Sequence, residues 1–162
     1  METKDEVIRE FQKIPWFQEL DPVHLQKISE ISRLRHVRAG EVLFREGDAE
    51  DYLYIVVEGR VALDMFIPHQ GKVRIYTAEP WDVFGWSSVI PIVRKRTAGA
   101  VAVVKGSVIA IHSEKLRQVC DEDHDLGYVV MRRLANIVAS RLLVTRLQML
   151  DMFASLEVKN GK

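Results

Sequence analysis

The sequence is poor in the residues from which several kinds of site are built. Cys120 is the one cysteine among 162 residues. A single thiol excludes an internal disulfide and leaves a cysteine-ligated zinc or iron–sulfur site without its ligands. The five histidines are scattered, with no H-x-H pair and no acidic residue at metal-binding spacing. We therefore expect no metal and no cofactor, and we interpret Cys120 as a partly buried structural thiol.

An excess of charge is also absent, because 23 Lys and Arg residues balance 23 Asp and Glu residues. Proteins that bind nucleic acid usually carry a basic surplus, so we expect no nucleic acid partner. The longest uncharged run, residues 83–93, is too short to cross a bilayer. The charged start METKDEVIRE is unlike a secretory signal. These absences predict a cytoplasmic protein with no membrane contact.

No catalytic pattern stands out either. His112 and Ser113 adjoin, but neighbours in a strand point to opposite faces of the sheet. A metal-dependent enzyme on a double-stranded β-helix would need clustered histidines and carboxylates, which are lacking. We predict that the protein is not an enzyme and keep a metal-dependent enzyme as the least favoured alternative.

The first region, residues 1–36, has the periodicity of helices. Apolar residues recur at three- and four-residue steps from Val7 to Ile14, and the same spacing continues from Leu25 to Ser32. Between them, Asp21 followed by Pro22 is typical of a helix N-cap and first helical position. We therefore predict two N-terminal helices.

The second region, residues 37–113, consists of short apolar runs separated by glycine turns. The tripeptide HQG at 69–71 is a hairpin signal between two of these runs. Strands at this spacing predict an antiparallel sandwich or barrel rather than a parallel sheet. The expected strands are VLF (42–44), YLYIVV (52–57), VALDMF (61–66), VRIYT (73–77), AVAVV (100–104) and VIAI (108–111).

The third region, residues 114–155, is helical and precedes a short tail at 156–162. Ser113 is expected to cap a short helix that reaches residue 120, and a long helix is expected from about 126 to about 153. The apolar arc of the long helix is wider than one contact requires. We interpret the surplus as the interface of a homodimer, while a helix wrapped over a large core is the alternative. The main apolar stripe comprises Met131, Leu134, Val138, Leu142, Thr145, Met149 and Met152.

The segment DVFGWSSVIPIVRKRTA (82–98) gathers groups that bind anions. A glycine turn at Gly85 followed by one helical turn would present backbone N–H groups to a phosphate. Ser87 and Ser88 add hydroxyls, while Arg96 and Thr97 add a forked cation and a further hydroxyl. An arginine that pairs with a carboxylate in an ordinary loop would account for the same residues without a ligand.

The order of these elements resembles the cyclic nucleotide-binding domain, and in particular the sensor half of the Crp/Fnr (catabolite activator) regulators. IPWFQELDPVHLQKI is similar to the entry helices of that family, and RAGEVLFREGDAEDYLYIVVEGRVAL to its opening strands. VFGWSS with RTA resembles its phosphate-binding cassette. The resemblance implies an α+β fold, an antiparallel β jelly-roll (double-stranded β-helix) flanked by N-terminal helices and one long C-terminal helix.

The resemblance also implies roles for single residues. Gly85, the backbone of Ser87, Arg96 and Thr97 match the positions that hold the cyclic phosphate, and Thr145 matches a threonine that meets adenine. Trp86 stands where the family commonly has a glutamate that accepts a hydrogen bond from the ribose 2′-hydroxyl. Loss of that charged acceptor should remove roughly 1.5–3 kcal/mol, or about one to two orders of magnitude in affinity.

Two interpretations follow from the resemblance. The first is a stand-alone sensor that binds cyclic AMP, another cyclic nucleotide or another anion, dimerises through the long helix and signals to a separate effector protein. The alternative is a degenerate, ligand-free dimeric interaction scaffold whose pocket Trp86 fills. Family regulators continue into a helix-turn-helix unit, whereas only ASLEVKNGK follows Phe153. We therefore expect no sequence-specific DNA binding.

Overall fold

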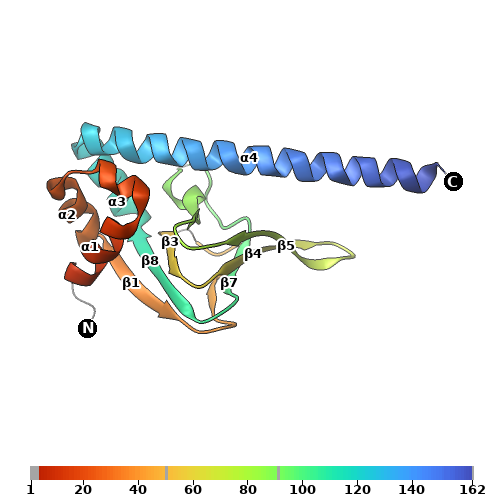
Figure 1. Cartoon of the computed structure of the whole chain (residues 1–162), viewed down its shortest axis with the longest axis horizontal. Coiled ribbons are helices and arrows are strands. Elements are labelled where there is room, and N and C mark those ends of the chain that lie inside the picture. Colours follow the sequence, from red (N-terminus) through yellow and green to blue (C-terminus); the bar gives the residue numbers. More distant parts are fainter. Residues whose placement is uncertain (1–3, 50, 91, 162) are drawn as a thin grey trace.

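The structure is a computed structural model that describes residues 4–49, 51–90 and 92–161. Its N-terminal region contains α1 (Lys4–Lys13), the short 3-10 helix η1 (Pro15–Glu19) and α2 (Pro22–Glu30). The predicted cap is present, because the carboxylate of Asp21 accepts a hydrogen bond from the backbone N–H of His24 at 2.8 Å. These helices pack against one end of the strand region (Figure 1).

The structure corrects the end of the second predicted helix. The helical region was expected to reach residue 36 and the second helix to include Ser32, but α2 ends at Glu30 and Ser32–Val37 form strand β1. β1 pairs with β8 (Gly106–His112) in antiparallel register from Ser32 opposite Ile111 to Val37 opposite Gly106. Leu34 and Val37 are buried. Pairing with a strand about 70 residues or more along the chain outweighs the local helical spacing. A short window of sequence cannot detect such a partner.

The described strands form two four-stranded antiparallel sheets, in the orders β1-β8-β3-β6 and β2-β7-β4-β5 (Figure 1). This arrangement confirms the predicted jelly-roll. A hydrophobic core that includes Val56, Phe84 and Val108 lies between the sheets. A second core joins the first sheet to the helices. The remaining strands are β2 (Val42–Phe44), β3 (Tyr52–Glu58), β4 (Val61–Ile67), β5 (Gly71–Ala78), β6 (Val83–Phe84) and β7 (Gly99–Ala102).

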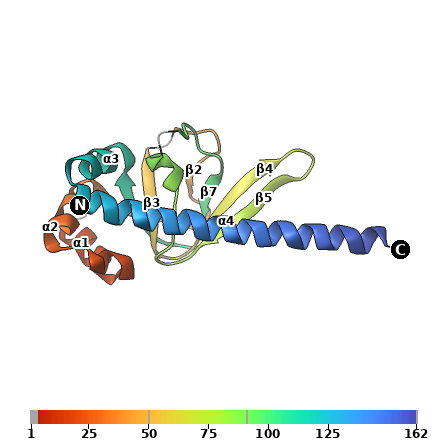
Figure 2. The ribbon, with the colours of Figure 1, turned by 90° about the horizontal axis from the view of Figure 1, so that it is seen from above.

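The C-terminal region contains α3 (Ser113–Glu122) and α4 (His124–Asn160). α3 begins where predicted, but His112 is its cap, because Nδ1 accepts from the N–H of Lys115. α4 is longer at both ends than predicted. It runs across the strand region and beyond the tip of the β4–β5 hairpin in both views (Figures 1 and 2). None of the described helices combines the length and apolar character needed to cross a membrane.

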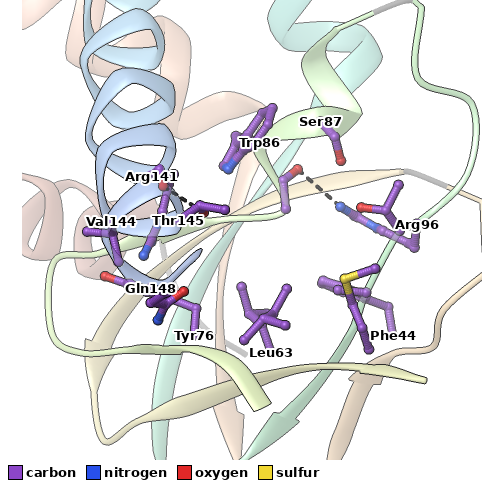
Figure 3. Close-up of a pocket in the computed structure, with 15 residues that line it drawn as sticks. Phe44, Leu63, Tyr76, Trp86, Ser87, Arg96, Arg141, Val144, Thr145 and Gln148 are labelled. Carbon is purple, nitrogen blue, oxygen red and sulfur yellow. Dashed lines mark hydrogen bonds between the residues drawn. The ribbon is translucent and has the colours of Figure 1, made fainter. Parts of the chain in front are cut away.

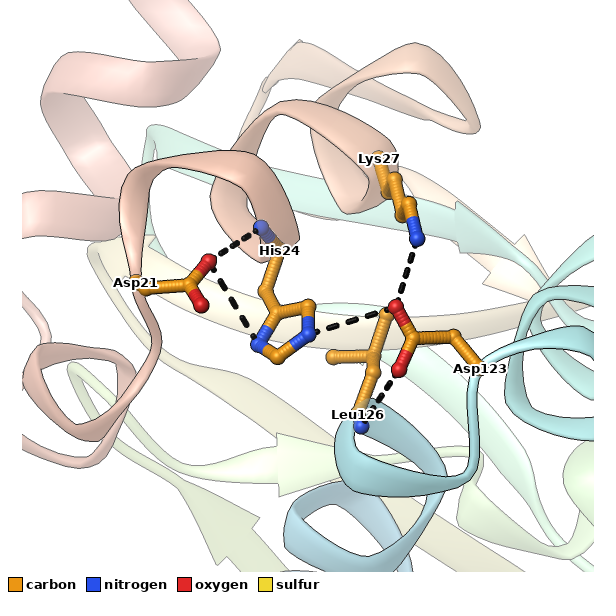
Figure 4. A network of polar contacts seen from close by, with 5 residues as sticks. All are labelled: Asp21, His24, Lys27, Asp123 and Leu126. Atoms are coloured by element: carbon orange, nitrogen blue, oxygen red, sulfur yellow. Dashed lines mark hydrogen bonds and ion pairs between the residues drawn. The ribbon is translucent and has the colours of Figure 1, made fainter.

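A polar network fixes the start of α4 to α2 (Figure 4). Asp123 caps α4 by accepting from the N–H of Leu126 at 3.2 Å. Its other oxygen accepts from Lys27 Nζ at 2.5 Å and lies 3.2 Å from His24 Nε2. The hydrogen bond from Lys27, followed by that from Leu126, lowers the pKa of Asp123 to about 2. The first turn of α4 is therefore anchored, whereas its second half projects away from the network.

Candidate functional site

The loop after β6 has the glycine turn that the sequence predicted. Gly85 adopts a left-handed backbone with φ of 68° and precedes the 3-10 helix η2, Trp86–Val89. The carbonyl of Gly85 accepts hydrogen bonds from the N–H of Ser88 at 3.2 Å and from its hydroxyl at 2.7 Å. A residue with a side chain is strained in this conformation, so the tight turn favours glycine.

Arg96 holds this turn against the sheet. Its Nη1 donates to the carbonyl of Gly85 at 3.1 Å and its Nη2 to the carbonyl of Tyr52 at 2.5 Å. The guanidinium carbon lies 4.1 Å from the ring centroid of Phe44, and the residue is only 4% exposed. A Cβ atom on Gly85 would lie 2.7 Å from Nη1. The close approach of loop and arginine thus depends on glycine at position 85.

A cavity of about 360 Å³ opens between this loop, the second sheet and α4 (Figure 3). Its volume lies within the range of roughly 300–1,000 Å³ that small-molecule sites have. Trp86 is half-buried and contributes to the wall, so its indole leaves the cavity open rather than filling it. The sheet side of the cavity is largely apolar and supplies Phe44, Leu63, Met65, Ile75 and Tyr76.

The structure brings six of the seven predicted site residues to this cavity: Gly85, Trp86, Ser87, Arg96, Thr97 and Thr145. Their binding roles stay predictions. The seventh, Ser88, is not among the lining residues and is 3% exposed. Its hydroxyl accepts from Ser113 Oγ at 2.6 Å, and its carbonyl accepts from Arg117 Nη1 at 2.7 Å. Ser88 therefore ties η2 to α3, which corrects the expectation that it contacts a ligand.

α4 supplies one wall of the cavity through Arg141, Val144, Thr145 and Gln148. Arg141 was missed by sequence reasoning, although it lies one helical turn before Thr145 and so on the same face. Its Nη2 donates to the carbonyl of Val83 at 3.2 Å, and its guanidinium carbon lies 3.0 Å from the ring centroid of Tyr76. Burial lowers the pKa of Arg141 to about 10, which leaves it charged at neutral pH.

The profile of the cyclic nucleotide-binding domain matches residues 34–123, more than half of the chain. The chain belongs to this family. It is 27% identical over 123 residues, 72% of its length, to a cyclic nucleotide-gated potassium channel of Mesorhizobium japonicum. Because it covers only 30% of that channel, the activity of the whole channel is not carried over.

Solved structures of proteins from this family have the same fold as this chain. A cyclic nucleotide-binding-like protein of Brucella abortus is 30% identical with a TM-score of 0.57, over 72% of this chain and 99% of that one. The catabolite activator protein of Thermus thermophilus is 25% identical with a TM-score of 0.62, over 88% of this chain and 62% of that one. The resemblance to the family is thereby confirmed, while the ligand is a separate question.

Proposed function

We propose that this chain is a sensor module that binds a nucleotide or another anionic ligand in the cavity between the Gly85 loop and α4. The observation that carries the proposal is that the cavity has Arg96 on one side and Thr145 of α4 on the other. A ligand of nucleotide size would therefore contact the cassette and the long helix together. It would favour the position of α4 that provides both contacts, and thus shift the population of helix positions.

The signalling surface in this proposal is the second half of α4. Ten apolar side chains there are exposed: Leu142, Leu143, Val144, Leu147, Met149, Leu150, Met152, Phe153, Leu156 and Val158. Such an accumulation on a helix that projects beyond its domain is typical of a surface that another chain covers.

A second copy of the same helix fits the spacing of this surface. Uncharged residues recur at alternating steps of four and three, which is the 3.5-residue period of a left-handed coiled coil. Thr145 lies both on this seam and in the cavity wall, so a ligand at Thr145 and pairing of the helices would affect each other. The seam comprises Met131, Ala135, Val138, Leu142, Thr145, Met149, Met152 and Leu156.

The ligand proposal is tested by isothermal titration of the purified chain with cyclic AMP and cyclic GMP. Trp86→Glu supplies a carboxylate acceptor at the position that has none, so affinity should rise by roughly ten- to hundred-fold. Trp81→Glu is the matched control, because Trp81 is exposed and does not line the cavity. It should leave the affinity as in the wild type.

Two results would support the scaffold alternative instead. In the first, neither the wild type nor Trp86→Glu gives a heat of binding with either nucleotide, although both proteins unfold cooperatively. In the second, Trp86→Glu and Trp81→Glu gain the same affinity for the nucleotide, since a site-specific acceptor cannot act from both positions.

The dimer is tested by sedimentation equilibrium at tens of micromolar protein. Met149→Glu places a charge on the seam and should convert the dimer to a monomer, because an unpaired charge in an apolar interface is costly. Ala154→Glu adds the same charge on the exposed side of α4 opposite the seam and should leave the dimer intact. A monomeric wild type, or the same mass for both variants, would contradict the dimer.

A further inference from the structure

The charged residues that the structure describes in the cavity wall are of one sign. Two of the described lining residues, Arg96 and Arg141, are cationic, and no described lining residue is acidic. Arg96 enters from the loop that follows η2, whereas Arg141 enters from α4. The two cations therefore reach the cavity from different elements. A ligand that contacts both cations with negative charge must present that charge to two separate parts of the wall.

The guanidinium of Arg141 has hydrogen-bond donors that are available to a ligand. Within the described part of the chain, one of its five N–H groups has an acceptor, the carbonyl of Val83. Its guanidinium otherwise stacks on Tyr76, and no carboxylate pairs with it among the described residues. A half-buried cation without a counter-ion keeps most of its desolvation cost, which a bound anion would offset.

The absence of a hydrogen-bond acceptor at position 86 also favours a ligand that brings additional acceptor groups. A carboxylate there would favour a ligand that donates a hydrogen bond, such as a sugar hydroxyl. Trp86 offers only its indole N–H, which donates. Both Trp86 and Arg141 therefore favour a ligand whose groups on this side accept hydrogen bonds.

We infer that the ligand carries two separate anionic groups, one held by the cassette with Arg96 and the other by Arg141. The inference rests on the proposed function, since it names the chemical class that this same cavity prefers. A phosphate or carboxylate would serve as the second group, because a guanidinium binds either through paired N–H donors. Cyclic AMP has a single anionic group and leaves Arg141 uncompensated.

The experiment compares nucleotides that share one adenosine body. Adenosine 3′,5′-bisphosphate has two separate phosphates, whereas cyclic AMP has one phosphate that bridges the same positions, and adenosine 5′-monophosphate has one at the 5′ position. Titration of the wild type should give an affinity for the bisphosphate roughly ten- to hundred-fold above that for either other nucleotide.

Variants on α4 then test whether Arg141 causes the preference for the bisphosphate. Arg141→Gln keeps a long polar side chain without charge and should reduce the preference for the bisphosphate to less than about three-fold, with little change for the monophosphate. Arg141→Lys retains the charge and should keep part of the preference. Arg146→Gln is the control, because Arg146 is exposed on the same helix and does not line the cavity. Its preference should equal that of the wild type.

The outcomes separate this inference from the proposed function. If nucleotides bind but the wild type shows no preference for the bisphosphate, the second anionic group is refuted and the sensor proposal stands. The same conclusion follows if Arg141→Gln keeps the full preference while unfolding cooperatively. If no nucleotide binds to the wild type or to Trp86→Glu, both proposals fail together.

Discussion

Replacing Gly85 by alanine should destabilise the protein more than the same replacement at another glycine with a positive φ. Gly40 is the reference, because its φ is 80° and a Cβ there would meet no atom within 4 Å. Alanine in the left-handed region costs roughly 1–2 kcal/mol, and this cost applies to both positions. The difference between the two variants therefore isolates what the new methyl group contacts.

At position 85 the nearest contact is Arg96, followed by the carbonyl oxygen of Tyr52 at 3.2 Å and the ring of Tyr54 at 3.3 Å. The added Cβ would lie 2.7 Å from Nη1, so the guanidinium must move. Arg96 is 4% exposed and donates to two backbone carbonyls, so it cannot move without breaking the hydrogen bond to Gly85. A hydrogen bond from a charged donor contributes roughly 1.5–3 kcal/mol. Gly85→Ala should thus lose about that much more unfolding free energy than Gly40→Ala.

Urea unfolding followed by tryptophan fluorescence measures the difference. All chains are compared at one protein concentration, because the proposed dimer would make apparent stability depend on concentration. The denaturant slope should be the same in the three proteins, so that the midpoints report stability. Equal losses of unfolding free energy for Gly85→Ala and Gly40→Ala would refute the argument that Arg96 is held in place by its hydrogen bonds to the turn.

Two further predictions concern the start of α4. Asp123→Asn should lower the melting temperature at neutral pH, because the ion pair with Lys27 is lost while an amide can still cap the helix. The pKa of Asp123 is lowered to about 2, so its contribution is present above the unfolded pKa of about 3.9 and is lost as the pH falls toward 2. The gap in melting temperature should therefore narrow between about pH 4 and pH 2, and a constant gap would contradict this assignment. Gly127→Ala should also lower the melting temperature, although alanine normally stabilises a helix by roughly 0.5–1 kcal/mol. Its Cβ would lie 2.7 Å from the carbonyl oxygen of Cys120, and a higher melting temperature would show that α3 yields to it.

Features set by neighbouring residues were predicted from the sequence. The Asp21–Pro22 helix start and the turn at 69–71 follow from local backbone preferences, and both occur in the structure. The glycine turn at Gly85, followed by one helical turn, belongs to the same group. All six predicted strands occur, because their apolar runs end at turn residues, although β7 ends at Ala102 and not at residue 104.

The conformation of Ser88 and the boundary of β1 were decided by residues far along the chain. Ser88 follows Ser87 in the sequence and has the same side chain. The Ser88 hydroxyl is nevertheless buried, where it accepts a hydrogen bond from Ser113. Residues Ser32–Val37 have no strong strand pattern and become a strand through pairing with β8. Neither partner is visible in a local window of the sequence, because the contact of Ser88 spans 25 residues and the pairs of β1 with β8 span about 70 or more.

The sequence by itself determined the family, the jelly-roll and the loop that carries Gly85 and Arg96, because ordered motifs and turn chemistry are local properties of the chain. Only the tertiary structure placed Arg141 beside Tyr76 in the wall of the same cavity. A helix pattern shows which residues share a face, but not which sheet that face meets. The charge balance of the cavity follows from that packing, and the proposed class of ligand is inferred from it.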